Sequence, residues 1–289
     1  MANLSCKCKI FADDIKLYLS FEVTDSSGVA SLQADIDRVV TAGMSWNLKL
    51  NPDKCVVLRF LPQRSQLPSS GNSPYTVGNK NLKFVDSHSD LGVTIDRSLK
   101  FHNHIRHRVA VAGALTTNLL SSTLCRSPEF IMNIYCSQIR PQLEYGSHLW
   151  NTGFVGDLKL LERIQRRWTR AVVGLEDKPY NERLDALNLF SFRGRLLRQD
   201  MIMVWKIFHN LSAIAPSDLF TPSCAANTRG HPLKIQVQQT RLDVNKRFFS
   251  NRVVSTWNSL AADTVLAANV DTFKSRLHRD LGEQLYQFY

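Results

Sequence analysis

The chain has 289 residues, and 44% of them are hydrophobic, which is enough for one large or two modest domains. Its formal net charge of +11 is unusual for a small-molecule enzyme and favours a polyanionic partner, with a generally basic surface as the alternative. No run of about 18 apolar residues and no apolar signal-peptide core occurs, so the sequence predicts no transmembrane helix and no membrane partner. The six cysteines are scattered, which favours free thiols in a reducing intracellular compartment, nucleus or cytoplasm, over a zinc site.

The first predicted element is a β-hairpin whose tip carries two adjacent aspartates. Apolar and polar residues alternate beside the tetrapeptide Phe11-Ala12-Asp13-Asp14. Two neighbouring carboxylates repel each other unless a cation lies between them, and Mg²⁺ or Mn²⁺ takes oxygen ligands of this kind. The pattern therefore indicates either an ordinary turn or a metal-binding pair of the type that polymerases use to hold two ions.

A helix and several short strands are expected after the hairpin. Helix-start residues at 25–28 precede apolar residues at helical spacing. A strand is predicted over 56–60, an exposed loop rich in Pro and Ser over 61–74, and a set of short strands over 75–96.

Helical spacing begins after residue 96. Apolar residues from Ile105 to Leu119 form one stripe. A second helix is expected to begin with Ser127 as its N-cap and Pro128 at its first position, and to end at Pro141. Three histidines precede the first stripe and are interpreted as a polar helix start rather than a metal site: His102, His104 and His107.

The clearest basic surface lies on the next predicted helix. Five cations share one side of this helix, opposite an apolar side that includes Leu161 and Trp168, and only Glu162 offsets their charge. The five are Lys159, Arg163, Arg166, Arg167 and Arg170. Such a stripe would neutralise phosphates and give binding that falls steeply with salt, and a solvated helix face is the alternative.

The last part of the chain divides into two segments by composition. Residues 211–239 are rich in Pro, Ser, Ala, Thr and Asn and are predicted to be a linker. Residues 240–289 are predicted to be a C-terminal helical segment, with the apolar residues around Trp257 in its core.

Several motifs in a fixed order resemble the reverse transcriptases of non-LTR (LINE-type) retrotransposons, jockey-like ones in particular. The motifs are Phe11-Ala12-Asp13-Asp14, the segment from Trp46 to Cys55, the segment from Leu91 to Asp96, the segment from Ile139 to Gly146, and Arg247-Phe248-Phe249. The resemblance runs over nearly the whole chain and corresponds to the C-terminal portion of such a polymerase.

The resemblance implies an α+β fold with a truncated palm followed by mainly helical regions. Residues 1–96 would be a partial palm with a primer-grip-like hairpin, and residues 97–210 a helical thumb. The implied activity is that of an RNA-directed DNA polymerase, a metal-dependent nucleotidyl transfer. It would use Mg²⁺ or Mn²⁺, with an RNA template, a DNA primer and their RNA–DNA duplex as partners.

The resemblance also implies roles for single residues. Asp13 and Asp14 match the metal-binding pair. Lys54 matches a lysine near the pyrophosphate leaving group, where it would neutralise charge or donate a proton, and a solvated turn lysine is the alternative. Leu91, Gly92 and Val93 match the primer-grip turn, and an ordinary hairpin is the alternative.

One catalytic residue of the family has no counterpart at its usual place. The palm of the family carries a further aspartate well upstream of the aspartate pair, and Met1–Ile10 contains no acidic residue. We therefore expect a truncated reverse transcriptase that is inactive on its own. A non-catalytic nucleic-acid-binding module and an expressed retrotransposon relic are the alternatives.

Overall fold

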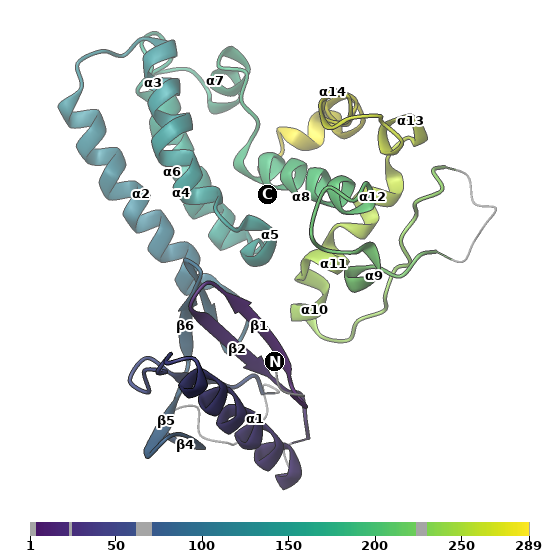
Figure 1. The fold of residues 1–289 in the computed structure, drawn as a ribbon. Coiled ribbons are helices and arrows are strands. Elements are labelled where there is room, and N and C mark those ends of the chain that lie inside the picture. Colours follow the sequence, from purple (N-terminus) through teal and green to yellow (C-terminus); the bar gives the residue numbers. More distant parts are fainter. Residues whose placement is uncertain (1–3, 23–24, 62–70, 224–229, 289) are drawn as a thin grey trace. The chain divides into compact units, whose positions relative to one another are not determined.

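The computed structural model describes residues 4–22, 25–61, 71–223 and 230–288 (Figure 1). The chain forms two compact units. Unit 1 consists of Met1–Asp90 and Thr94–Ser98, and unit 2 of Leu91–Val93 and Leu99–Tyr289. Within the described residues the strands lie mostly in unit 1 and most helices in unit 2, which confirms the mixed α and β composition expected from the sequence.

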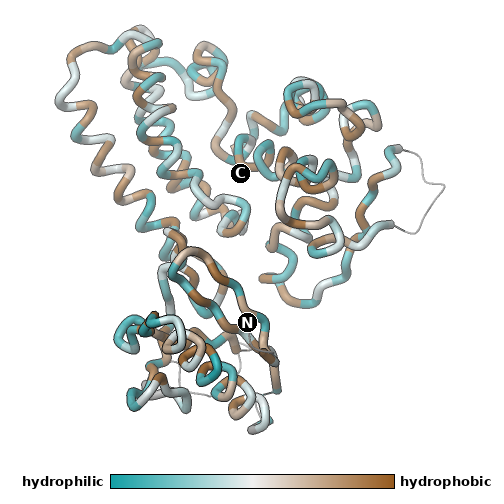
Figure 2. Tube along the Cα trace, viewed as in Figure 1, coloured by the Kyte–Doolittle hydropathy of each residue, from teal (hydrophilic) through white to brown (hydrophobic). Residues whose placement is uncertain are grey.

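Unit 1 begins with the predicted hairpin. Strands β1 (Lys7–Phe11) and β2 (Asp14–Tyr18) pair antiparallel, with Phe11 opposite Asp14. Ala12 takes a φ of 50°, so the connection is a tight two-residue turn formed by Ala12 and Asp13. Figure 2 shows apolar residues along both strands, and several of them are exposed, including Phe11 at 62%. The hairpin prediction is confirmed.

Helix α1 (Ser26–Ser45) covers the small core of unit 1. Asp25 is its N-cap and accepts a hydrogen bond from the Ser27 amide at 2.8 Å. The helix packs against β2 and β4, and Ile36 contributes to the core. Its buried Asp35 accepts a hydrogen bond from the Cys6 amide at 2.7 Å, which ties the start of the hairpin to the helix.

A three-stranded sheet lies on the other side of this core. Its order is β3 (Val56–Leu58), β5 (Lys80–Val85), β4 (Gly71–Val77), with β3 parallel and β4 antiparallel to β5. Strand β3 is shorter than the predicted 56–60. Strand β4 starts earlier than predicted and includes Pro74, because an edge strand beside a register shift does not need every backbone N–H in the ladder. Residues 62–70 of the predicted loop lie outside the described residues.

A second hairpin joins the two units in sequence. Strand β6 (Ser87–Asp90) pairs with β7 (Val93–Asp96) through Leu91 and Gly92. These two residues have φ values of 46° and 79°, which is the geometry of a turn that favours glycine.

The regular structure of unit 2 is mostly helical among the described residues. Its first helices are α2 (His102–Ser122), α3 (Pro128–Ile134), the π-helix η1 (Tyr135–Ile139), α4 (Arg140–Glu144), α5 (Ser147–Trp150), α6 (Val155–Arg170), α7 (Tyr180–Ala186) and α8 (Phe192–Phe208). The remaining helices are α9 (Pro216–Leu219), α10 (Asp243–Arg247), α11 (Phe249–Arg252), α12 (Val254–Ser259), α13 (Ala262–Val265), α14 (Val270–Leu281) and the 3₁₀ turn η2 (Gly282–Leu285). Helix α2 lies beside α6 and α4, and α6 also packs against α8 (Figure 1).

The prediction that a helix ends at Pro141 is wrong. Ser127 caps α3 as expected, but the helical path continues through η1 and α4 to Glu144. The wide π turn, in which the Arg140 amide donates to the Tyr135 carbonyl, shifts the hydrogen-bond register just before the proline. Pro141 therefore occupies the first turn of a new α-helical segment, where its missing N–H costs nothing.

The core of unit 2 is large and aromatic. Trp257 is fully buried, and its ring stacks on Phe208 with centroids 5.4 Å apart. Residues of α8, α12 and α14 form this core. The stretch expected to be a linker contributes to it, because Phe220 and Ile235 are both at most 5% exposed. Composition favoured a linker there, yet single large apolar residues anchor its described parts; residues 224–229 lie outside the described residues.

The chain's last turn is fastened to the start of α8. The Ser191 hydroxyl caps this helix and donates to the carbonyl oxygens of Leu285 and Gln287 at 3.1 and 2.6 Å. Leu285 is itself fully buried.

Candidate catalytic hairpin and nucleic-acid interface

The two aspartates occupy different positions on the first hairpin. Asp13 lies in the turn, whereas Asp14 is the first residue of β2, and both side chains are exposed. The hairpin therefore presents two acidic oxygen donors next to each other at its tip, as the sequence predicted. Such a pair attracts a divalent cation.

The donor set at this tip is incomplete for a two-metal site. Two ions that clamp the attacking and leaving oxygens of a phosphoryl transfer need several carboxylate ligands held in place. Across the described part of the chain, no three His, Cys, Asp or Glu side chains gather as a possible metal site. The residues present thus do not fit a complete Mg²⁺ or Mn²⁺ centre.

Lys54 lies in a short turn after the first helix. Its amide donates to the Asn51 carbonyl at 3.1 Å, and the Asn51 side chain accepts from the Asp53 amide at 2.9 Å. The Lys54 side chain is exposed, and among the described residues no ion pair joins it to Asp13 or Asp14. The structure does not bring this lysine together with the aspartate pair.

An ion pair that the sequence did not predict connects β2 of the first hairpin to β6 of the second. The Lys16 ammonium on β2 lies 2.6 Å from a carboxylate oxygen of Asp90 at the end of β6. Lys16 follows the aspartate pair by two residues, and Asp90 immediately precedes the turn of the second hairpin. The ion pair therefore joins β2 to the end of β6 within unit 1. No pattern of neighbouring residues in the sequence predicts this ion pair, because Lys16 and Asp90 are far apart in the chain.

The Leu91–Val93 turn contacts Tyr145 and Gly146, which belong to the motif over 139–146. The Tyr145 hydroxyl donates to the Leu91 carbonyl at 2.9 Å, and a Cβ placed on Gly92 would lie 3.3 Å from the Tyr145 ring. Val93 is buried beside Gly146. The motif ending in Tyr145-Gly146 thus fixes the turn, and glycine fits because both the left-handed φ and the ring leave little room.

The basic stripe of α6 is divided by the structure. Four of its members are exposed: Lys159, Arg163, Arg167 and Arg170. Arg166 is half-buried instead, because its guanidinium stacks over the Tyr180 ring at 4.0 Å and faces the Phe288 ring at 5.2 Å. The described helix therefore presents four cations, not five, on its exposed side.

Glu162 does not offset the stripe from the surface. It is 1% exposed and accepts hydrogen bonds from the Phe192 amide, at 3.0 Å for the shorter one, and from the Tyr180 hydroxyl. Burial raises the pKa of its carboxyl, while these hydrogen bonds act in the opposite direction. Its role is to hold α6 to the N-terminus of α8, so the exposed face of α6 is more one-signed than the sequence indicates.

The three histidines of α2 have separate roles. His102 lies 2.6 Å from the buried carboxylate of Asp157 on α6. His104 is 2% exposed, and burial together with the charges of Arg108 and His107 lowers its pKa to about 4. His102 is the first residue of α2 and His107 is exposed, as a polar helix start requires, so that interpretation is wrong only for the buried His104.

Comparison with known proteins finds relatives by sequence. Proteins similar to the chain are RNA-directed DNA polymerases of mobile elements, which confirms its relation to jockey-like reverse transcriptases of non-LTR retrotransposons. No family model matches the chain, and no solved structure matches it significantly.

Two relatives give the extent of the similarity. The RNA-directed DNA polymerase from mobile element jockey of Drosophila melanogaster is 22% identical over 170 residues, which cover 57% of this chain. The protein of the same name from Drosophila funebris is 25% identical over 171 residues, also 57% of this chain. In both cases the match covers 18% of the relative, so the chain spans about a fifth of the length of the curated relatives it matches.

The helices give no membrane-spanning candidate. Over the residues that the structure describes, none is both long enough and apolar enough to cross a bilayer.

Proposed function

We propose that this chain is the C-terminal portion of a retrotransposon reverse transcriptase, with unit 1 as part of its palm and unit 2 as its thumb and C-terminal region. The observation that carries the proposal is the Asp13/Asp14 hairpin, joined through Lys16 and Asp90 to the element that leads into the Leu91–Val93 turn. Similarity to mobile-element polymerases supports the same conclusion.

In the proposed mechanism the aspartate pair supplies two of the carboxylates of a nucleotidyl-transfer site. Mg²⁺ or Mn²⁺, when bound, would stabilise the negative charge on the transferred phosphoryl group. Asp13 and Asp14 would contribute oxygen ligands from the hairpin tip, and the proposed site needs a further carboxylate that does not gather with them among the described residues. The 289-residue chain alone is then inactive in primer extension.

Unit 2 supplies the proposed nucleic-acid contact. The exposed cations of α6 form a row along one helix, which suits a phosphate backbone. The Leu91–Val93 turn, fixed by Tyr145, would contact the primer strand. RNA–DNA duplex binding is therefore expected even without catalysis, whereas an expressed relic would show neither.

The test combines primer extension and duplex binding on one folded preparation. With an RNA template and Mg²⁺ or Mn²⁺, we expect no extension by the chain and none by Asp13→Asn. We expect RNA–DNA duplex binding whose logarithmic salt slope weakens by about 2 in Lys159→Gln/Arg170→Gln, because each lost phosphate contact removes about 0.9.

The matched control removes two lysines elsewhere in unit 2, the exposed Lys246 and the half-buried Lys274, by Lys246→Gln/Lys274→Gln, and should leave the salt slope close to that of the wild type. Extension that is lost in Asp13→Asn would show that the site is complete within the chain, against the proposed inactivity. Absence of salt-dependent duplex binding would contradict the proposed thumb.

A further inference from the structure

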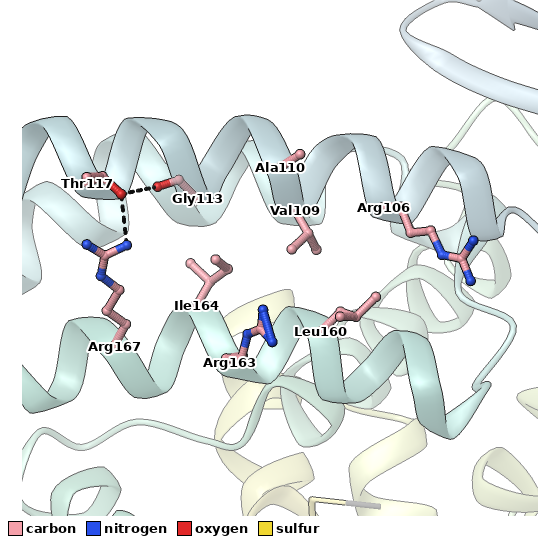
Figure 3. A pocket seen from close by; sticks show the side chains of 9 residues that line it. All are labelled: Arg106, Val109, Ala110, Gly113, Thr117, Leu160, Arg163, Ile164 and Arg167. Carbon is pink, nitrogen blue, oxygen red and sulfur yellow. Dashed lines mark hydrogen bonds between the residues drawn. The ribbon is translucent and has the colours of Figure 1, made fainter.

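A groove runs between helices α2 and α6 on the surface of unit 2 (Figure 3). It has a volume of 660 Å³. Its floor is apolar, with Val109 and Ala110 from α2 and Leu160 and Ile164 from α6. Ala110 is exposed, and Val109 and Leu160 are only half-buried, so the floor is open to solvent.

The spacing of the groove residues has the form of a helix-packing surface. Those of α2 fall at 106, 109, 110, 113 and 117, and those of α6 at 160, 163, 164 and 167. Each set repeats at three and four residues, which is the row that one helix offers to another. Gly113 carries no side chain, so the centre of the groove on the α2 side is lined by backbone. A Cβ added there would lie at an ordinary contact distance of 3.7 Å from Ile164.

No third helix of the described residues lines this groove. Helix α2 packs against α4 as well as α6, and α6 packs against α7 and α8. The groove lies outside these contacts, and its lining residues come from α2 and α6 alone.

The rim of the groove is basic. Arg106 lies toward one end of it, Arg167 toward the other, and Arg163 between them (Figure 3). The Arg167 guanidinium donates to the Thr117 hydroxyl across the groove at 2.9 Å. Within the described residues, no carboxylate forms an ion pair with any of these three arginines.

We propose that this groove binds an amphipathic acidic helix of a partner protein. An apolar ridge on such a helix would cover Val109, Ala110 and Ile164, and its flanking carboxylates would neutralise the rim arginines. A nucleic-acid backbone would satisfy the arginines but would leave the apolar floor facing phosphates and water. The charge of the rim and the chemistry of the floor are complementary together to an acidic amphipathic helix.

Docking there has a regulatory consequence that rests on the proposed function. Arg163 and Arg167 belong both to the groove and to the proposed phosphate-binding row of α6. A bound acidic helix would therefore compete with the RNA–DNA duplex for these two side chains, and the partner would control access of unit 2 to nucleic acid.

The test uses a synthetic three-heptad peptide with leucine at positions a and d and glutamate at e and g, labelled for fluorescence anisotropy. The whole chain should bind it, and should bind a shuffled glutamate peptide and a peptide with lysine at e and g at least about tenfold more weakly. The groove variant is Ala110→Gln/Gly113→Gln, which makes the floor polar and bulky without changing charge. It should bind the glutamate peptide at least about tenfold more weakly while retaining duplex binding.

Ala114→Gln is the matched control, since Ala114 is exposed on α2 but does not line the groove. It should bind both ligands as the wild type does, and circular dichroism should show all variants folded. Equal binding of the shuffled peptide, or full peptide binding by the groove variant, would overturn the inference. Peptide binding without duplex binding in the wild type would instead contradict the proposed function and leave the groove assignment standing.

Discussion

The two units differ most clearly in the placement of their tryptophans. Trp46 of unit 1 is 69% exposed, whereas the four tryptophans of unit 2 are each at most 2% exposed. Unit 1 also exposes Leu48 at 64%, and its small core is built around Ile36 and three residues of β4 and β5. Unit 2 thus has the larger buried apolar core, while unit 1 leaves several large apolar side chains exposed.

The sheets of unit 1 are also small and leave apolar side chains exposed. Its strands form separate two- and three-stranded sheets, and the β1–β2 hairpin that carries the aspartates exposes Phe11 and Ile10. A two-stranded hairpin is marginally stable by itself and gains stability from further strands or a packed helix. Any strand or helix packed on the aspartate hairpin would therefore be expected to stabilise it.

The largest predicted effect tests this contrast with a pair of tryptophan substitutions. Trp257→Ala should destabilise the protein by about 3–5 kcal/mol, because it leaves a cavity in the core of unit 2. Trp46→Ala should change stability by about 0.5 kcal/mol or less, because the ring is already in solvent. Urea unfolding followed by circular dichroism measures both. A comparable loss in the two variants would remove the distinction between the units.

The second prediction concerns the pH dependence of unit 2. The pKa of His104 is about 4 in the folded chain against an ordinary value of 6.5, so the unfolded state binds its proton first as the pH falls. The stabilising contribution of neutral His104 is therefore fully present well above pH 6.5 and is lost toward pH 4, by about 1.6 kcal/mol between pH 6.5 and 5.

Urea unfolding at several pH values measures this loss, and His104→Gln should flatten the dependence over that interval. His88→Gln is the control, because His88 is exposed and is the histidine of unit 1. An unchanged slope in His104→Gln would show that this imidazole is not the group responsible.

The smallest predicted effect compares two turn glycines, one assigned to each unit. Gly78 and Gly92 have φ values of 58° and 79°, so alanine at either should cost about 1 kcal/mol. Only Gly92 has a neighbour in reach, because a Cβ added there would lie 3.3 Å from the Tyr145 ring, whereas nothing lies within 4 Å at Gly78. Gly92→Ala should therefore cost more than Gly78→Ala in thermal unfolding, and equal costs would mean that Tyr145 yields freely.

Local signals predicted those elements whose formation depends on neighbouring residues. The alternation around Asp13 gave the first hairpin, and Asp25 and Ser127 marked helix starts that the structure confirms as N-caps. In each case a hydrogen bond or a turn a few residues away decides the conformation, so the sequence contains the information directly.

The features that escaped prediction depend on residues far apart in the chain. The spacing of Arg166 predicts an exposed cation, but its guanidinium lies over the rings of Tyr180 and Phe288, which are distant in sequence. Pro141 appeared to be a helix end because the π turn before it has no simple sequence signature. The candidate site shows the same division. The adjacent Asp13 and Asp14 form a motif that is visible in the sequence, whereas the Lys16–Asp90 ion pair joins residues far apart in the chain and is visible only in the structure.

The bond between Ser191 and the end of the chain has a consequence for the synthesis of the protein. The hydroxyl and its acceptor Leu285 are 94 residues apart, and Leu285 completes the core around α8. On the ribosome, the apolar side of α8 cannot be fully covered until Leu285 has also been synthesised. During that interval the nascent chain displays Trp205 and Met201 to its surroundings, where chaperones recognise such surfaces, so its yield should depend on how quickly the residues between Ser191 and Leu285 are translated.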